Sequence, residues 1–185
     1  MANKSYLFVD GYNIINSWAN LKQTMMNVGL DSAREELLDI MAEFQTISDE
    51  IVTVVFDAHE LKGSFGSIEH YKGLTVIYTK ECETADHYIE RVLDKFSQKK
   101  HGRKNKIRVA TSDGMIQQIV LGRGGIRVSA PELLAEYHSI KHSVNRFERK
   151  KSKNIKIKNI VSIDEDTLNK LESILDNNKD LNWSV

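Results

Sequence analysis

Three aspartates each follow a run of residues that is typical of a buried β-strand. Asp10 follows YLFV, Asp57 follows IVTVVF, and Asp113 follows KIRVATS. Because the carboxyl ends of parallel strands meet at one edge of a sheet, these carboxyl groups are expected to lie close together. Clustered carboxylates repel one another unless a cation neutralises them, and oxygen ligands suit Mg²⁺ or Mn²⁺. The pattern predicts a site for one or two such ions.

A fourth carboxylate, Asp86, is expected in the first turn of a helix that begins near Thr84. The start of that helix faces the same sheet edge, and its dipole keeps a carboxylate ionised there. Glu90 lies about 6 Å further along the axis at roughly 1.5 Å per residue, so Asp86 is the preferred ligand. A lone aspartate after a strand is usually a helix cap or turn residue, but agreement among four favours a site.

Hydrolysis of a phosphodiester is the reaction that best uses such a site, because a bound metal ion activates water and stabilises the leaving oxygen. Asn13 could bind substrate, or it could simply form a turn. Ser112 and Thr111 could orient Asp113 or touch a phosphate, with helix capping as the alternative. The candidate catalytic residues and metal ligands are Asp10, Asp86 and Asp113, with Asp57 as a further metal ligand.

The elements that must position these residues alternate between strand and helix, which predicts an α/β fold with a central, mainly parallel sheet. Residues 11–30 are predicted to form a loop or short helix, and residues 58–73 an extended loop beside the site. Strands are predicted at 6–9, 51–56, 74–78, 107–111 and 126–128. Helices are predicted at 31–48, from 84, at 114–121, and from a capping box at 129–132 to about residue 141.

The formal net charge is zero, but the charges are unevenly distributed. Residues 91–158 hold 18 Lys and Arg against 5 Asp and Glu, a net charge of +13, and the remainder holds 8 against 21. A polyanion such as RNA, held by a basic surface and presented to acid-bound metal ions, would use both halves. The segment KKHGRKNK is either a solvated turn or a substrate contact made by Lys99, Lys100, Arg103 and Lys104.

The single cysteine, Cys82, excludes an intramolecular disulfide, and no paired Cys spacing for zinc is present. A reducing, cytoplasmic location fits this composition best. No apolar run approaches the roughly 20 residues of a membrane helix, so no membrane partner is expected.

Four ordered motifs, FVDGYNII, VVFDAHE, TADHYIE and ATSDGMIQ, resemble the YacP-type NYN-domain family of PIN-like ribonucleases. The resemblance implies a three-layer α/β/α sandwich, divalent-metal-dependent endoribonuclease activity, and an association with ribosomes and mRNA cleavage. By motif it assigns the acidic residues Asp10, Asp86 and Asp113, with Asn13 beside them, and Asp57 matches FDAHE.

The predicted nuclease domain covers residues 1–141. Residues 142–185 are predicted to form a basic linker or arm and a short amphipathic helix that begins near Ser162. That closing helix is acidic, which departs from the family pattern and argues against direct RNA contact by it.

Two other classes of protein compete with a nuclease. A PIN-like module that binds RNA or the ribosome without cutting would use the basic half, but it has no use for carboxylates that repel phosphate. A phosphotransfer fold is the second. The haloacid-type phosphatase motif needs a second aspartate where Tyr12 stands, and a receiver domain needs paired acids after its first strand.

Overall fold

The structure is a computed structural model that describes residues 4–57, 66–81, 83–98 and 106–161. The chain divides into two compact units, Met1–Lys141 and His142–Val185. Every candidate site residue named from the sequence belongs to the first unit. Lys99, Lys100, Arg103 and Lys104 lie outside the described residues.

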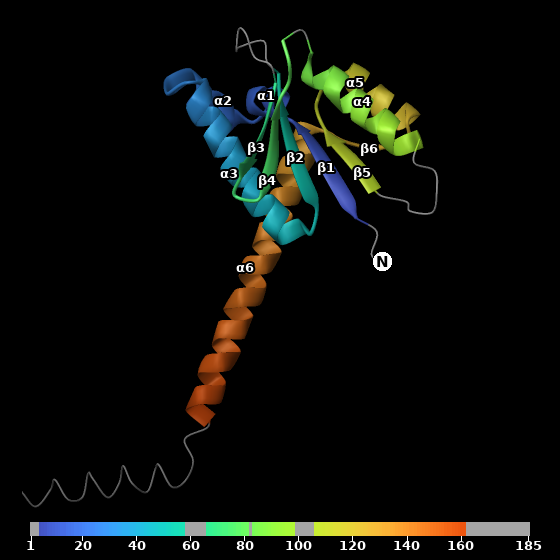
Figure 1. The fold of residues 1–185 in the computed structure, drawn as a ribbon. Helices are drawn as coiled ribbons and strands as arrows, with labels where there is room; N and C mark the ends of the chain where they lie inside the picture. Colours follow the sequence, from blue (N-terminus) through green and yellow to red (C-terminus); the bar gives the residue numbers. More distant parts are fainter. Residues whose placement is uncertain (1–3, 58–65, 82, 99–105, 162–185) are drawn as a thin grey trace, which may run out of the picture. The chain divides into compact units, whose positions relative to one another are not determined.

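The described residues form a six-stranded sheet in the order β3-β4-β2-β1-β5-β6 (Figure 1). All neighbouring strands are parallel except β3 and β4, which pair antiparallel. The strands are β1 (Ser5–Asp10), β2 (Ile51–Phe56), β3 (Ser67–Tyr71), β4 (Leu74–Tyr78), β5 (Lys106–Ala110) and β6 (Ile126–Val128). The mainly parallel sheet predicted from the sequence is therefore confirmed.

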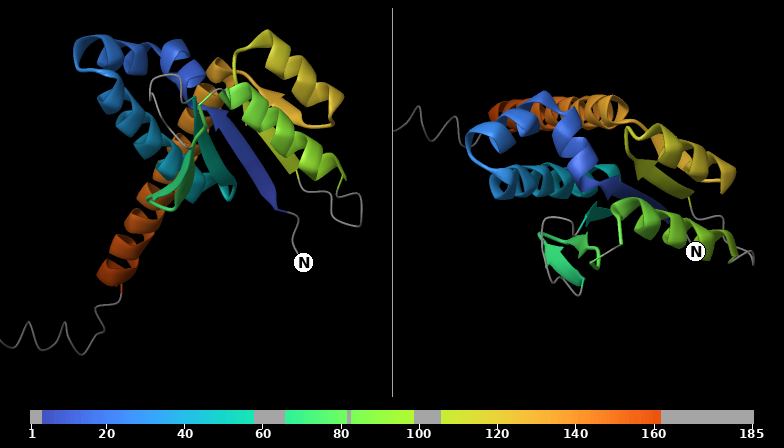
Figure 2. Two further views of the ribbon diagram at one scale, coloured as in Figure 1. Left: turned by 45° about the horizontal axis from the view of Figure 1, so that its top comes forward. Right: turned by 90° about the horizontal axis from the view of Figure 1, so that it is seen from above.

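Helices cover both faces of the sheet, as the views in Figure 2 show. Alternate strand residues point to opposite faces, so Leu7 and Val9 contact one core and Phe8 contacts the other. The first core is shared with α1 (Gly11–Ser17), α2 (Ala19–Asn27), α3 (Leu30–Ser48) and the start of α6 (Ala130–Val161). The second is shared with α4 (Ala85–Gln98) and α5 (Gly114–Gly122). The result is the predicted α/β/α sandwich.

Two connections are more regular than predicted. In the stretch 11–30, predicted as a loop or short helix, the chain forms two helices, α1 and α2, because Ile14, Ile15 and Leu21 are fully buried and supply the apolar face that helices need. In the predicted loop at 58–73, residues 67–71 form the edge strand β3. Its side chains are mostly exposed, so it lacks the apolar alternation that marks a strand in the sequence.

The helix α6 begins with the predicted capping box. The Ser129 N–H donates to the Glu132 carboxylate at 2.7 Å, and the Glu132 N–H points back to Ser129 Oγ at 3.4 Å. The helix continues to Val161, so residues 142–159, predicted as a linker or arm with little periodicity, are helical. The sequence contains no Gly or Pro between 132 and 161 that would end the helix. The closing helix predicted near Ser162 lies outside the described residues.

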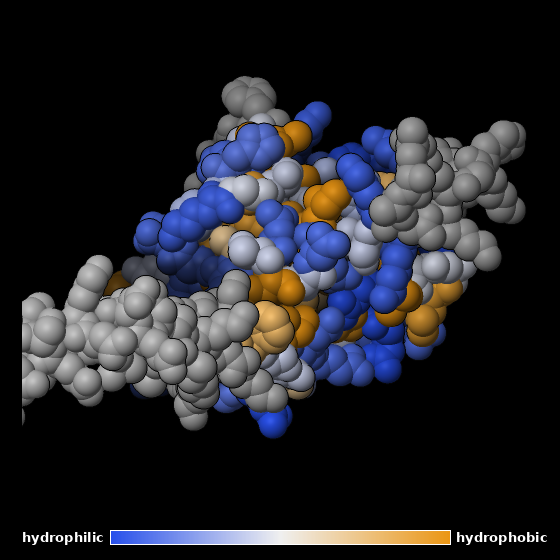
Figure 3. Space-filling model, turned by 90° about the horizontal axis from the view of Figure 1, so that it is seen from below, coloured by the Kyte–Doolittle hydropathy of each residue, from blue (hydrophilic) through white to orange (hydrophobic). Residues whose placement is uncertain are grey.

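None of the helices in the described ranges is long and apolar enough to cross a membrane. At the end of the sheet where β1 begins, Figure 3 shows hydrophilic and hydrophobic residues interspersed on the surface.

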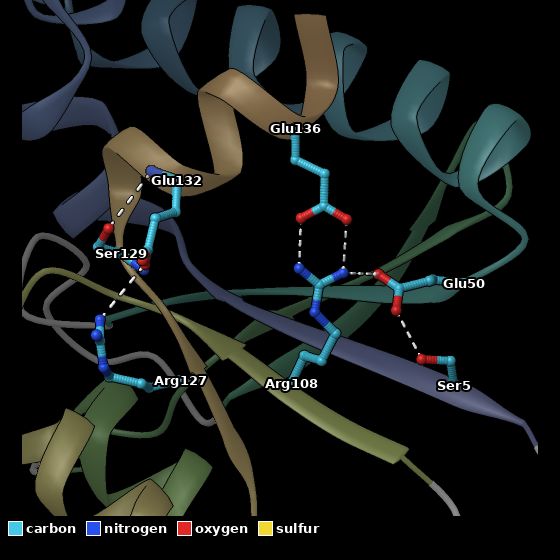
Figure 4. A network of polar contacts seen from close by, with 7 residues as sticks. All are labelled: Ser5, Glu50, Arg108, Arg127, Ser129, Glu132 and Glu136. Atoms are coloured by element: carbon cyan, nitrogen blue, oxygen red, sulfur yellow. Dashed lines mark hydrogen bonds and ion pairs between the residues drawn. The ribbon is translucent and has the colours of Figure 1, made fainter. Parts of the chain in front are cut away.

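A buried ion network ties three elements together near that end (Figure 4). The Arg108 guanidinium on β5 donates to Glu50 at 2.8 Å and forms paired bonds to Glu136 on α6. Ser5 Oγ on β1 donates to Glu50 at 2.6 Å. Arg108 and Glu50 are only 9 % and 8 % exposed, so each carries a charge that the other must neutralise.

We expect Arg108→Met to lower the free energy of unfolding by about 3–5 kcal/mol, because it leaves the buried Glu50 carboxylate without its cation. Arg127→Met is the matched control, since the Arg127–Glu132 pair is exposed and its loss should cost at most about 1 kcal/mol. Urea denaturation of both variants tests this. Equal losses in the two variants would contradict the role assigned to Arg108.

Candidate active site

A cavity of about 800 Å³ lies at the edge of the sheet where the strands end. Asp10 is the last residue of β1, Asp57 follows β2, and Asp113 precedes α5. Asp86 comes from the first turn of α4. The cavity lining brings together five of the residues predicted from the sequence: Asp10, Asn13, Asp57, Asp86 and Asp113.

Asp10 is the most buried of these carboxylates, with 8 % of its surface exposed. Its Oδ1 accepts a hydrogen bond from the Asn13 N–H at 3.3 Å, which caps α1, and its Oδ2 accepts one from Thr111 Oγ1 at 3.2 Å. The pKa of Asp10 is raised from 3.8 to about 6, and burial is the largest cause. Within that net shift the charges of Asp86 and Asp113 also act to raise the pKa, and the two hydrogen bonds act to lower it.

Asp113 caps α5 and is linked to Asp10 through Thr111. Its Oδ1 accepts from the N–H groups of Met115 at 2.7 Å and Ile116 at 3.3 Å, and its own N–H donates to Thr111 Oγ1 at 3.1 Å. Both capping bonds use Oδ1, so Oδ2 has no hydrogen bond within the residues described. Asp113 can therefore cap α5 through Oδ1 and still line the cavity.

Asp86 is held at the cavity by the start of α4, where Thr84 Oγ1 accepts the His87 N–H at 3.2 Å. Burial raises the pKa of Asp86, and the charges of Asp113 and Asp57 raise it further. Glu90, the alternative one turn later, does not line the cavity. It forms an ion pair with Arg123 at 2.5 Å.

Asn13 and Ser112 connect the two sides of the site. The Ser112 N–H donates to Asn13 Oδ1 at 2.7 Å, so the amide oxygen of this cavity residue is already engaged in a hydrogen bond. Ser112 does not line the cavity, and its Oγ accepts the Ala130 N–H at the start of α6 at 3.2 Å. Ser112 thus links Asn13 to the start of α6, and its predicted contact with substrate stays a prediction.

Several cavity residues carry no chemical signal in the sequence. Tyr12 lies in the DGYN motif, but the predicted functional residues of that motif are its neighbours Asp10 and Asn13. Met25 and Leu30 lie in segments for which the sequence predicts no role in the site. The residues that sequence reasoning missed are Tyr12, Asn16, Met25, Leu30, Thr84 and Ala85.

The donor chemistry of the cavity fits a hard divalent cation. Its acidic side chains are the four aspartates, and the repulsion among their carboxylates is of the kind that Mg²⁺ or Mn²⁺ relieves. Across the described ranges, however, no three His, Cys, Asp or Glu side chains are grouped so that they could hold an ion. The oxygen atoms of these side chains are of the kind that such an ion binds, and they lie along one edge of the sheet. They do not form a closed coordination shell.

Comparison with known proteins gives consistent results. The family model of the YacP-like NYN domain matches residues 7–176. The chain is 42 % identical over 144 residues to YacP of Bacillus subtilis, a protein described as uncharacterized, covering 78 % of this chain and 81 % of that one.

Two crystal structures of Rae1 (YacP) from Bacillus subtilis also match, each with a TM-score of 0.63. One of them is the structure of a mutant. It is 40 % identical to this chain, and the match covers 80 % of this chain and 82 % of the mutant. The other structure is 35 % identical, and the match covers 95 % and 97 %.

The three-layer fold and the carboxylates at the strand ends define a PIN-like, nuclease-type domain. More narrowly, the chain belongs to the YacP-like NYN family, so the resemblance seen in the sequence motifs is confirmed.

The raised pKa of Asp10 predicts a pH-dependent stability difference. The folded state binds this proton more tightly than the unfolded state, so stability is lost as pH rises from about 4 to about 6. In metal-free buffer above about pH 7, Asp10→Asn should therefore be more stable than wild type by about 2–3 kcal/mol, and the difference should vanish near pH 4. Denaturant unfolding at both pH values measures it.

Asp39→Asn is the control with the opposite sign, because hydrogen bonds from Lys72 and Tyr71 lower the pKa of Asp39. A stability difference for Asp10→Asn that stays constant between pH 4 and pH 7 would contradict the raised pKa.

Proposed function

We propose that this protein is a divalent-metal-dependent endoribonuclease that hydrolyses phosphodiester bonds in single-stranded RNA. The observation that carries the proposal is the convergence of Asp10, Asp57, Asp86 and Asp113 on one cavity at the carboxyl edge of the sheet. Membership of the YacP-like NYN family, an RNA-related nuclease-type module, supports it.

In this proposal Asp10, Asp86 and Asp113 hold one or two Mg²⁺ or Mn²⁺ ions, and Asp57 is a further ligand. When bound, such an ion supplies Lewis acidity toward water and toward the scissile phosphate. Thr111 holds Asp10 and the backbone of Asp113 in one arrangement. Asn13 Nδ2 donates to a phosphate oxygen, because its Oδ1 is already occupied by the Ser112 N–H.

The RNA is proposed to be mRNA bound in association with the ribosome, in the cytoplasm. The excess of 18 Lys and Arg over 5 Asp and Glu in residues 91–158 supports binding to a polyanion. The resemblance to the YacP-type family supports the ribosome as the partner.

A non-catalytic RNA-binding or ribosome-binding module is the alternative. One observation favours it: among the residues that the structure describes, no three His, Cys, Asp or Glu side chains are grouped so that they could hold an ion. Against it stand the carboxylates themselves, because an RNA-binding surface without a cation gains nothing from groups that repel phosphate.

We expect Asp10→Asn, Asp86→Asn and Asp113→Asn to abolish cleavage of single-stranded RNA, or to raise the Mg²⁺ requirement by more than about tenfold, a loss above about 1.4 kcal/mol. Each substitution removes one carboxylate charge that would bind the proposed ion, so the ion binds less tightly. The assay follows RNA cleavage against Mg²⁺ and Mn²⁺ concentration, in purified buffer and in translating extract.

Glu90→Gln is the matched control, because Glu90 is on the same helix as Asp86 but pairs with Arg123 outside the cavity. It should stay within a few-fold of wild type. Full activity in all three aspartate variants would remove these residues from the proposed catalytic site. No cleavage by the unmodified protein at any Mg²⁺ or Mn²⁺ concentration, in buffer or in extract, would overturn the nuclease proposal in favour of the binding module.

RNA or ribosome binding should weaken steeply with salt, since the basic surface displaces condensed counterions. Replacing Lys99, Lys100, Arg103 and Lys104 with Ala should lower both the affinity and the slope of log K against log salt concentration, measured by fluorescence anisotropy. An unchanged slope would show that these residues form only a solvated turn.

A further inference from the structure

The cavity at the sheet edge has two chemically different sides. One side carries the carboxylates already described. The other is uncharged and is built from Tyr12 on α1, Met25 on α2 and Leu30 at the start of α3. Metal binding and hydrolysis explain the first side but leave the second without a role.

Tyr12 is held in place at both ends of its ring. The ring packs against Phe56 with a centroid distance of 5.1 Å and a tilt of 54°, and its hydroxyl accepts a hydrogen bond from Arg34 Nη1 at 3.1 Å. Gly11 makes room for this support, because a Cβ at that position would lie 2.3 Å from Phe56 Cε1. The half-buried Tyr12 ring is therefore a rigid surface that borders the cavity.

Two further apolar side chains are exposed near the end of α2. Met26 and Val28 are 75 % and 71 % exposed there, close in sequence to the cavity residues Met25 and Leu30. Contiguous apolar patches rimmed by polar residues often mark binding surfaces, and these two side chains add apolar surface at this end of α2.

We propose that Tyr12, Met25 and Leu30 form a subsite that stacks one nucleobase of the RNA beside the scissile phosphate. This inference rests on the proposed function. A nucleotide has a charged phosphate and a flat, largely apolar base, which match the two sides of the cavity in chemistry. The volume of about 800 Å³ falls in the range of small-ligand pockets. A rigid tyrosine suits this role because base stacking on an aromatic ring tolerates every base.

The test uses short single-stranded RNA carrying 2-aminopurine at each position in turn, because stacking quenches the fluorescence of this base. Binding is measured with Mg²⁺ in an Asp113→Asn background, which separates binding from cleavage. We expect strong quenching at one or two adjacent positions. Tyr12→Leu should remove it and weaken RNA binding at least about fivefold, equivalent to about 1 kcal/mol of stacking.

Two variants control for changes in folding. Tyr12→Phe keeps the ring and should keep the quenching. Tyr71→Leu loses a ring and a hydroxyl contact, to Asp39, away from the cavity and should also bind like the parent protein. Thermal unfolding of each variant shows whether the protein remains folded under assay conditions.

The outcomes separate this inference from the nuclease proposal. If Tyr12→Leu keeps the quenching and affinity while Asp10→Asn abolishes cleavage of the same RNA, the subsite is wrong and the nuclease stands. If quenching depends on Tyr12 but no metal supports cleavage, the subsite stands and the nuclease falls. If sedimentation shows self-association that Tyr12→Leu removes, a second copy of the chain covers Tyr12, Met25 and Leu30, and the base subsite is wrong.

Discussion

The parallel pairing of β1 with β2 and β5 is the constraint on which the site depends. The register sets Asp10 opposite Val55, two residues before Asp57, and sets Val9 opposite Ala110, three residues before Asp113. The same register brings Thr111 beside Asp10. The Thr111 hydroxyl donates to the Asp10 carboxylate and accepts a hydrogen bond from the Asp113 N–H. A slip of one residue in β1 would turn Asp10 to the other face of the sheet and dissolve this arrangement.

The carboxylates repel one another, and the fold accommodates that repulsion without removing it. Asp10 and Asp113 cap α1 and α5, and Asp86 lies in the first turn of α4, so each meets the positive end of a helix dipole. Burial nonetheless raises the pKa of Asp10 to about 6, with contributions from the neighbouring charges. A site in which carboxylates repel one another in the free protein is suited to a ligand that brings positive charge.

The order of elements along the chain, the cavity aspartates and the capping box of α6 could be predicted because each depends on local sequence: apolar runs, turn residues and cap spacing. Other features depend on contacts between distant residues. The Asn13–Ser112 bond spans 99 residues and the Arg108–Glu50 pair spans 58, so no local pattern signals them. The edge strand β3 escapes prediction because its side chains are exposed, and Tyr12 and Met25 escape it because the cavity exists only after α1 and α2 fold over the sheet.

The most direct test of the coupled carboxylate site is an NMR titration of the side-chain carboxyl carbon of Asp10, with and without Mg²⁺. The coupled site predicts a pKa near 6 in the metal-free protein, a lower value when Asp86 or Asp113 is changed to Asn, and a marked drop when Mg²⁺ is added. A pKa near the ordinary value of 3.8 that responds neither to these substitutions nor to Mg²⁺ would contradict it.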